Sequence, residues 1–199
     1  MLKISAAVSA LVLLMATSAQ AAPVFFTTGL SGAAEAPPNG SLGSGYSNVY
    51  FDIVAHTMQV VVSFTGLTTG NTNAHIHCCT AVPGVSTAGV ATTTPTFTGF
   101  PTGATSGFYD HTFDMTLASS YNAAFVTANG GSILAAETAL YNGLLAGRAY
   151  LNIHTSTVMS GEIRGFLAVP EPLTLSLFGA GLAGVAALRR RRRTENRAA

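Results

Sequence analysis

The sequence predicts an all-β fold, a single antiparallel β-sandwich domain with two short helices. Apolar and polar residues alternate with a period of two in several short runs, a pattern typical of strands with one buried face. Gly, Asn and Pro separate those runs and predict turns. Charged residues make up 9% of the chain, and the small and β-branched residues that replace them suit short strands.

Alternation predicts strands along most of the chain. They are expected at residues 24–30, 45–53, 58–64, 73–79, 108–117, 148–155 and 161–167. The second and third strands form a hairpin, and His56 in its turn is predicted to be solvated because loops lie on the surface. Residues 80–107, rich in Thr, Gly and Pro, are expected to form a long loop of the kind that is usually functional or mobile.

Two short helices are expected before the last two strands. Residues 119–128 have the apolar spacing of a helix, which Asn129 ends. Ser132 has the position of an N-cap for a second helix that continues to about Tyr141. Gly143 follows this segment and is expected to lie beyond its end.

The first 21 residues have the pattern of a secretory signal peptide rather than of a buried helix. Lys3 precedes an apolar run, and Ala19 and Ala21 form a small-x-small cleavage pattern. The apolar run is too short to span a membrane. We therefore expect the Sec translocon and signal peptidase to act on this segment, and the mature chain to begin at Ala22.

The C-terminal segment, residues 169–199, is equally distinct. Its parts are Pro170, Glu171 and Pro172, then an uncharged run from Leu173 to Leu188, then Arg189, Arg190, Arg191, Arg192 and Arg193. The run is slightly shorter than the ~20 residues with which a helix crosses a bilayer. The arginines would stay on the cytoplasmic side. Taken alone, this pattern also fits an ordinary C-terminal anchor.

This order of parts resembles the bacterial PEP-CTERM sorting signal. The resemblance implies recognition by an exosortase, a membrane enzyme that cuts near the Pro-Glu-Pro sequence and removes the apolar helix and its arginines. It implies a Gram-negative producer, membrane contact only transiently through residues 173–188, and release to the cell surface or matrix. The expected parts of the chain are then residues 1–21, 22–168 and 169–199.

The charge of the central domain limits its partners. Residues 22–168 hold two arginines, Arg148 and Arg164, against six Asp and Glu residues, which gives a net charge of minus four. The other basic residues lie in the two terminal segments. A domain of this sign without a basic patch argues against nucleic acids and anionic polymers as partners.

Three histidines lie in two of the predicted strands. His75 and His77 share one strand face because successive side chains alternate, and His154 lies on one face of a later strand. Two imidazoles at i and i+2 can reach one ion, and a third from another strand would complete a facial set. Imidazole ligands favour Cu or Zn. The alternative is that these histidines are structural and hydrogen-bond to loops.

Neighbouring polar residues have two interpretations. Glu162, across the hairpin from His154, could hold a ligand imidazole by its second nitrogen. Glu162, Arg164 and Asn152 could instead be structural and tie adjacent strands together.

The chain has two cysteines, Cys78 and Cys79, which are adjacent. Disulfides form in exported proteins, so a disulfide between these two residues is the favoured interpretation. Metal ligation and an intermolecular link are the alternatives. Because strand faces alternate, at most one of the two thiolates would join the histidines.

Five segments in order resemble a CHRD domain, a module first named from chordin and common in secreted bacterial proteins. They read LSGAAEAPP (30–38), FTGL (64–67), AHIH (74–77), GRAYLNIHT (147–155) and GEIRG (161–165). The resemblance covers residues 30–167 and implies a sandwich-like all-β domain. The histidine pair followed by two cysteines is similar to a bacterial subset of this family that also ends in Pro-Glu-Pro signals. One departure, V-M-S at 158–160 where the family usually has a proline, affects only the turn.

No enzyme motif is complete. The nucleophile elbow G-x-S-x-G, the metalloprotease sequence H-E-x-x-H and a phosphate loop are missing from the sequence. We therefore expect a non-enzymatic structural or binding protein of the cell surface or extracellular matrix. Exopolysaccharide and other copies of the chain are candidate partners. The alternative is a Cu- or Zn-binding protein, redox-active or not, built on His75, His77 and His154.

Overall fold

The computed structural model describes residues 22–170. Most of the predicted terminal features lie outside this range. They are the signal peptide with Ala19 and Ala21, and the sorting residues Glu171, Pro172 and Arg189 to Arg193. Pro170 is the last described residue and is exposed. Within residues 22–170, no helix is long and apolar enough to cross a membrane.

The described residues form seven strands in one antiparallel sheet of order β4-β6-β7-β1-β2-β3-β5. The strands are β1 (Val24–Ser31), β2 (Ser44–Asp52), β3 (Thr57–Thr65), β4 (Asn71–His77), β5 (Gly107–Asp114), β6 (Tyr150–Thr155) and β7 (Ile163–Phe166). Each strand overlaps the segment predicted for it. The all-β, antiparallel prediction is therefore confirmed.

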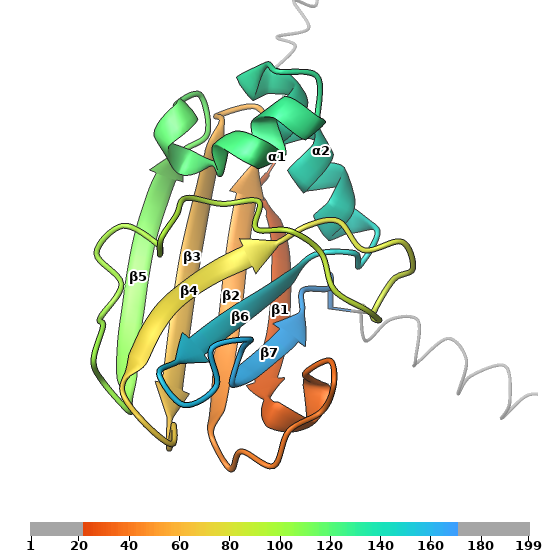
Figure 1. Ribbon diagram of the computed structural model, residues 1–199. Helices are drawn as coiled ribbons and strands as arrows, with labels where there is room; N and C mark the ends of the chain where they lie inside the picture. The colour runs from red at the N-terminus through yellow and green to blue at the C-terminus, as the bar shows by residue number, and fades with distance from the viewer. Residues whose placement is uncertain (1–21, 171–199) are drawn as a thin grey trace, which may run out of the picture.

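The two sheets of the predicted sandwich are instead two halves of one curled sheet, a half-barrel (Figure 1). β4, β6 and β7 form one half, and β1, β2, β3 and β5 form the other. The halves meet through the registered pair of Ser31 with Arg164 and an isolated bridge between Thr27 and Ala168, whereas β1 and β2 pair along the whole length of β1. So few pairs at this junction let the sheet fold over. Alternation reports which side chains are buried, and one sheet or two can satisfy it.

Four helical segments are present in the described chain: η1 (Gly32–Ala34), η2 (Ala118–Ser120), α1 (Ala123–Ala128) and α2 (Ile133–Leu145). The two α-helices confirm the prediction. Ser132 caps α2, because its side chain accepts a hydrogen bond from the Ala135 N–H. α2 continues past the end expected at about Tyr141, so Gly143 lies inside the helix and is buried.

The core lies between the halves of the sheet. Its buried members include Phe26, Phe51, Val60, Ile76 and Leu151. α1 and α2 cover one end (Figure 1), where Leu140 and Leu144 of α2 join the core cluster. The long loop after β4 adds Phe97, whose ring centroid lies 5.8 Å from that of Tyr109 on β5. This packing fixes β4 and β6, the two strands that carry the three predicted histidines.

Candidate metal centre

Adjacent strands bring the three predicted histidines together. β4 and β6 are antiparallel, and their register pairs His75 with Asn152 and Asn73 with His154. His75, His77 and His154 therefore share one face of this strand pair. One ring nitrogen of each histidine lies within 4.8 Å of the ring nitrogens of the other two. Such spacing allows one ion to contact all three rings.

Backbone carbonyls fix the orientation of each ring. His75 Nε2 lies 2.5 Å from Pro95 O, His77 Nδ1 lies 2.9 Å from Ala88 O, and His154 Nδ1 lies 2.9 Å from Met159 O. A carbonyl oxygen only accepts, so each of these nitrogens carries the proton and donates it. In a neutral ring the opposite nitrogen then has a free lone pair.

Those opposite nitrogens are all unsatisfied. His75 Nδ1, His77 Nε2 and His154 Nε2 are buried and have no hydrogen-bond partner. A buried acceptor without a donor is costly, and here three occur in one cluster. A bound cation would satisfy all three at once.

The protein also keeps the rings uncharged. Burial lowers the pKa of His75, His77 and His154, and it lowers the pKa of His77 to about 4. Repulsion from the neighbouring imidazoles lowers the pKa of His75 and His77 further. At neutral pH all three histidines are therefore in the form that binds metals.

Arg164 supports the site from outside. Its guanidinium carbon lies 4.7 Å from the centroid of the Tyr150 ring, which stacks on His77 at a centroid distance of 4.8 Å. Arg164 Nη1 also donates to Ser86 O at 3.0 Å. Ser86 belongs to the loop whose Ala88 carbonyl accepts from His77. Arg164 therefore holds both a ring and a loop that position this histidine.

Glu162 is tied to the scaffold instead of to an imidazole. Its carboxylate accepts from Ser41 Oγ and Thr155 Oγ1, each at 2.6 Å, and from the N–H and hydroxyl of Thr68, each at 2.8 Å. Burial raises the pKa of Glu162, but these hydrogen bonds outweigh burial and the net pKa is lowered. These contacts fit the structural interpretation of Glu162. Backbone carbonyls, and not this carboxylate, accept from the second nitrogen of each ring.

Asn152 adds a fourth unsatisfied acceptor on the same face. It lies opposite His75 in the strand register, and its Oδ1 is buried without a partner. Its amide packs against Gly161, where a Cβ would overlap it.

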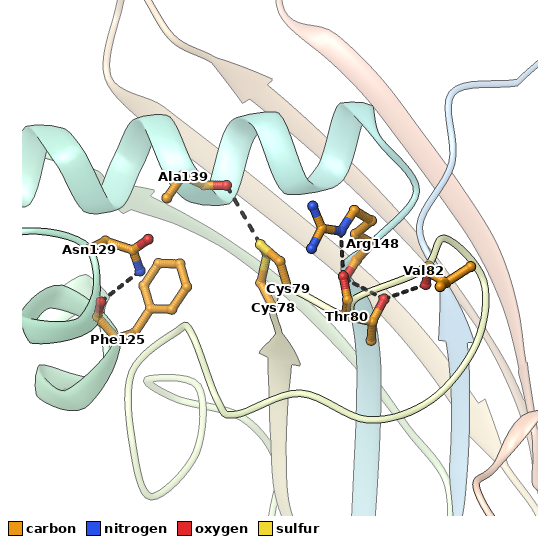
Figure 2. Close-up of a disulfide and its surroundings, with 8 residues drawn as sticks. All are labelled: Cys78, Cys79, Thr80, Val82, Phe125, Asn129, Ala139 and Arg148. Atoms are coloured by element: carbon orange, nitrogen blue, oxygen red, sulfur yellow. Dashed lines mark hydrogen bonds between the residues drawn. A yellow bond between two sulfur atoms is a disulfide. The ribbon is translucent and has the colours of Figure 1, made fainter.

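The two cysteines form a disulfide with each other beneath α2 (Figure 2). Neither sulfur is then a free thiolate for a metal. Cys79 Sγ lies 3.7 Å from Ala139 O of the helix. A Cβ at Gly143 would overlap both sulfurs. This close approach explains why a glycine lies within α2.

The sequence did not predict the partners that complete these contacts. The carbonyls of Pro95, Ala88 and Met159 belong to loops, and a backbone acceptor has no signature in the sequence. His56 was predicted to be solvated, and this is wrong in part. Its ring is 39% exposed, but its Nδ1 lies 2.7 Å from Oε2 of the buried Glu137.

A curled antiparallel sheet that gathers three histidines defines a β-domain with a candidate metal centre. Residues 26–167 match the family model of the CHRD domain, and residues 168–192 match that of the PEP-CTERM protein-sorting motif. The chain therefore belongs to the CHRD domain family. The sorting motif implies export to the cell surface and processing by exosortase. Comparisons with curated proteins and with solved structures gave no match.

Proposed function

We propose that this protein is a non-enzymatic, metal-binding component of the cell surface or extracellular matrix, with Cu or Zn held by His75, His77 and His154. One observation carries the proposal. Three buried imidazole nitrogens without hydrogen-bond partners belong to rings that lie together on one face of β4 and β6.

The competing explanation is that the three histidines only brace the loops. It accounts for the nitrogens that donate to Pro95, Ala88 and Met159. It leaves the other three nitrogens buried with no donor to satisfy them. A metal ion accounts for both sets, because ligand imidazoles usually donate their second N–H to a carbonyl or carboxylate.

Binding, rather than catalysis, is the proposed role of the ion. Three histidine ligands leave a position open for solvent or a small molecule. Glu162, the carboxylate across the hairpin from His154, is occupied by four hydrogen bonds and is not available as a general base. A copper-loaded protein with dismutase or oxidase activity would replace this proposal with the redox-active alternative.

The place of action follows from the sorting motif. Export and exosortase processing deliver the domain to the outside of the cell, where we propose that it contacts exopolysaccharide or further copies of itself. The two terminal strands of the sheet order differ in their outer edges. The long loop after β4 covers the edge of β4, where the N–H groups of Ala91 and Phe97 donate to Ile76 O and Ala74 O. Among the described strands β5 pairs with β3 alone, and such an edge is available for pairing between chains.

Metal content tests the proposal. The exported protein would be purified from producing cells, and its metals measured by mass spectrometry beside His75→Ala/His77→Ala and the control His111→Ala, a histidine of β5. We expect about one equivalent of Cu or Zn in the wild type and the control, and almost none in the double variant. A wild type that stays metal-free after incubation with Cu and Zn would refute the proposal.

A further inference from the structure

A second site with a buried polar atom that lacks a hydrogen-bond partner lies at the end of the sheet that α1 and α2 cover (Figure 1). There the turn between β2 and β3 meets α2. His56 in the turn lies 2.7 Å from Oε2 of Glu137, whose side chain is 1% exposed. The other carboxylate oxygen, Oε1, is buried and has no partner. This arrangement is separate from the three-histidine centre.

The pair borders a cavity of about 300 Å³. Its walls are His56, Met115, Thr116, Ile133, Leu134 and Glu137. This volume is at the lower end of the range of small-ligand pockets, about 300–1,000 Å³. Three of the six wall residues are apolar, so the cavity suits a ligand with a short apolar body.

The turn holds His56 in a fixed place. His56 has a positive φ of 55°, and its carbonyl accepts from the Met115 N–H at 2.8 Å. Asp52 Oδ1 accepts from the N–H groups of Val54 and Ala55 at 2.9 and 2.8 Å. A left-handed backbone is uncommon for a residue other than glycine and persists where surrounding contacts fix it. The contacts of the turn therefore fix the position of the imidazole that contacts Glu137 Oε2.

The charges at this site favour a cation. Glu137 contributes a carboxylate, and Asp114 lies close enough to His56 to interact with it electrostatically. Residues 22–170 contain two arginines and no lysine. Both arginines are engaged elsewhere, Arg148 with Thr80 O and Arg164 with Ala34 O. No cationic side chain of the described residues is therefore left to satisfy Oε1.

We propose that this cavity binds a protonated primary amine on a short apolar body, with its ammonium group on Glu137 Oε1. A guanidinium prefers both oxygens of a carboxylate, and His56 already occupies one, so a point-like ammonium fits better. The Thr116 hydroxyl donates to Asp114 Oδ1 at 2.6 Å and keeps its oxygen free to accept a second ammonium N–H. Met115, Ile133 and Leu134 then enclose the apolar body.

The test uses n-butylammonium as the probe and n-butanol as its neutral counterpart of equal length. The exported protein would carry ¹³C-methyl methionine, and NMR would follow Met115, which lines the cavity and is 0% exposed. Met159, in the hairpin before β7 and 80% exposed, serves as the internal reference. We expect a saturable shift of Met115 alone, with n-butanol about tenfold weaker because it lacks the charge.

Two variants make the test decisive. Glu137→Gln keeps the size of the side chain and removes its charge, and we expect about tenfold weaker binding of n-butylammonium. Leu134→Trp fills the cavity from a residue that is 64% exposed, so it tests the site even where Glu137→Gln does not fold. Equal binding of alcohol and amine, no saturable shift of Met115, or unchanged binding in a folded Glu137→Gln or Leu134→Trp variant would each overturn the proposal.

Discussion

Replacing Gly143 with alanine is expected to destabilise the protein, although the same change inside a helix usually stabilises it by about 1 kcal/mol. The added methyl group would overlap both sulfurs of the Cys78–Cys79 disulfide. α2 cannot easily move away, because Leu140 and Leu144 on either side of Gly143 are 0% exposed and anchor it in the core.

The magnitude follows from two opposing effects. Overfilling a well-packed core costs about 1–3 kcal/mol, from which about 1 kcal/mol of helix propensity is subtracted. We expect the free energy of unfolding to fall by up to about 2 kcal/mol. For a domain of this size, a loss of that size lowers the Tm by up to about 8 °C.

Urea unfolding measures the effect, and a double-mutant cycle assigns its cause. Gly143→Ala would be made in the wild type and in Cys78→Ala/Cys79→Ala, where the sulfurs are missing and the methyl group has room. In that second background we expect the alanine to be neutral or stabilising, so the sign of its effect changes. If Gly143→Ala stabilises the wild type, or shifts both backgrounds equally, the disulfide is not the reason for a glycine at this position.

Three further outcomes are expected. Burial raises the pKa of Glu35 to about 7 from its ordinary value of 4.5. Between these two pH values the folded state binds more protons than the unfolded state, so the free energy of unfolding falls as pH rises from about 4.5 to 7. Urea titrations across that range would show a flatter profile for Glu35→Gln, and an equal slope in the two proteins would contradict this. Glu162→Gln is expected to lose about 1–3 kcal/mol of stability at pH 7, because an amide donor replaces an acceptor among Ser41, Thr68 and Thr155. The same variant is expected to keep the proposed metal, and loss of metal from a folded variant would make Glu162 part of the centre. His154→Ala removes a proposed ligand and is expected to weaken Cu or Zn binding by at least about 100-fold, since groups outside the ligand set already contribute about 10–100-fold. Chelator competition measures this, and His111→Ala binding as weakly would refute it.

Local patterns were sufficient to predict the elements of this fold. Each strand was found because its apolar residues alternate, and α2 began where Ser132 provides a cap. The single curled sheet could not be predicted in the same way, since it depends on how β1 meets β7. Gly143 was misjudged for a related reason: its propensity favours a helix end, but a contact with residues about 65 positions earlier keeps it inside α2.

The candidate metal centre was partly predictable as well. The i, i+2 spacing of His75 and His77 predicts that they share a strand face, and His154 lies in a later strand with the same alternation of apolar and polar residues. The tautomers of these rings depend on carbonyls in loops, where any residue type supplies the same acceptor. The pair of His56 and Glu137 could not be predicted from the sequence, because 81 positions separate its members and neither lies in a recognisable motif.

The carbonyl bonds to the three rings have a consequence for how the proposed metal centre would acquire an ion. Each imidazole is already turned and protonated on the correct nitrogen before any metal arrives. Loading therefore requires little rearrangement, and a chelator should strip the ion while the sheet stays folded, unlike in zinc fingers, where binding is coupled to folding. A site assembled in advance takes its metal from whatever surrounds the finished domain. For a protein that is exported, the supply outside the cell then decides the occupant, and at equal supply copper would displace zinc.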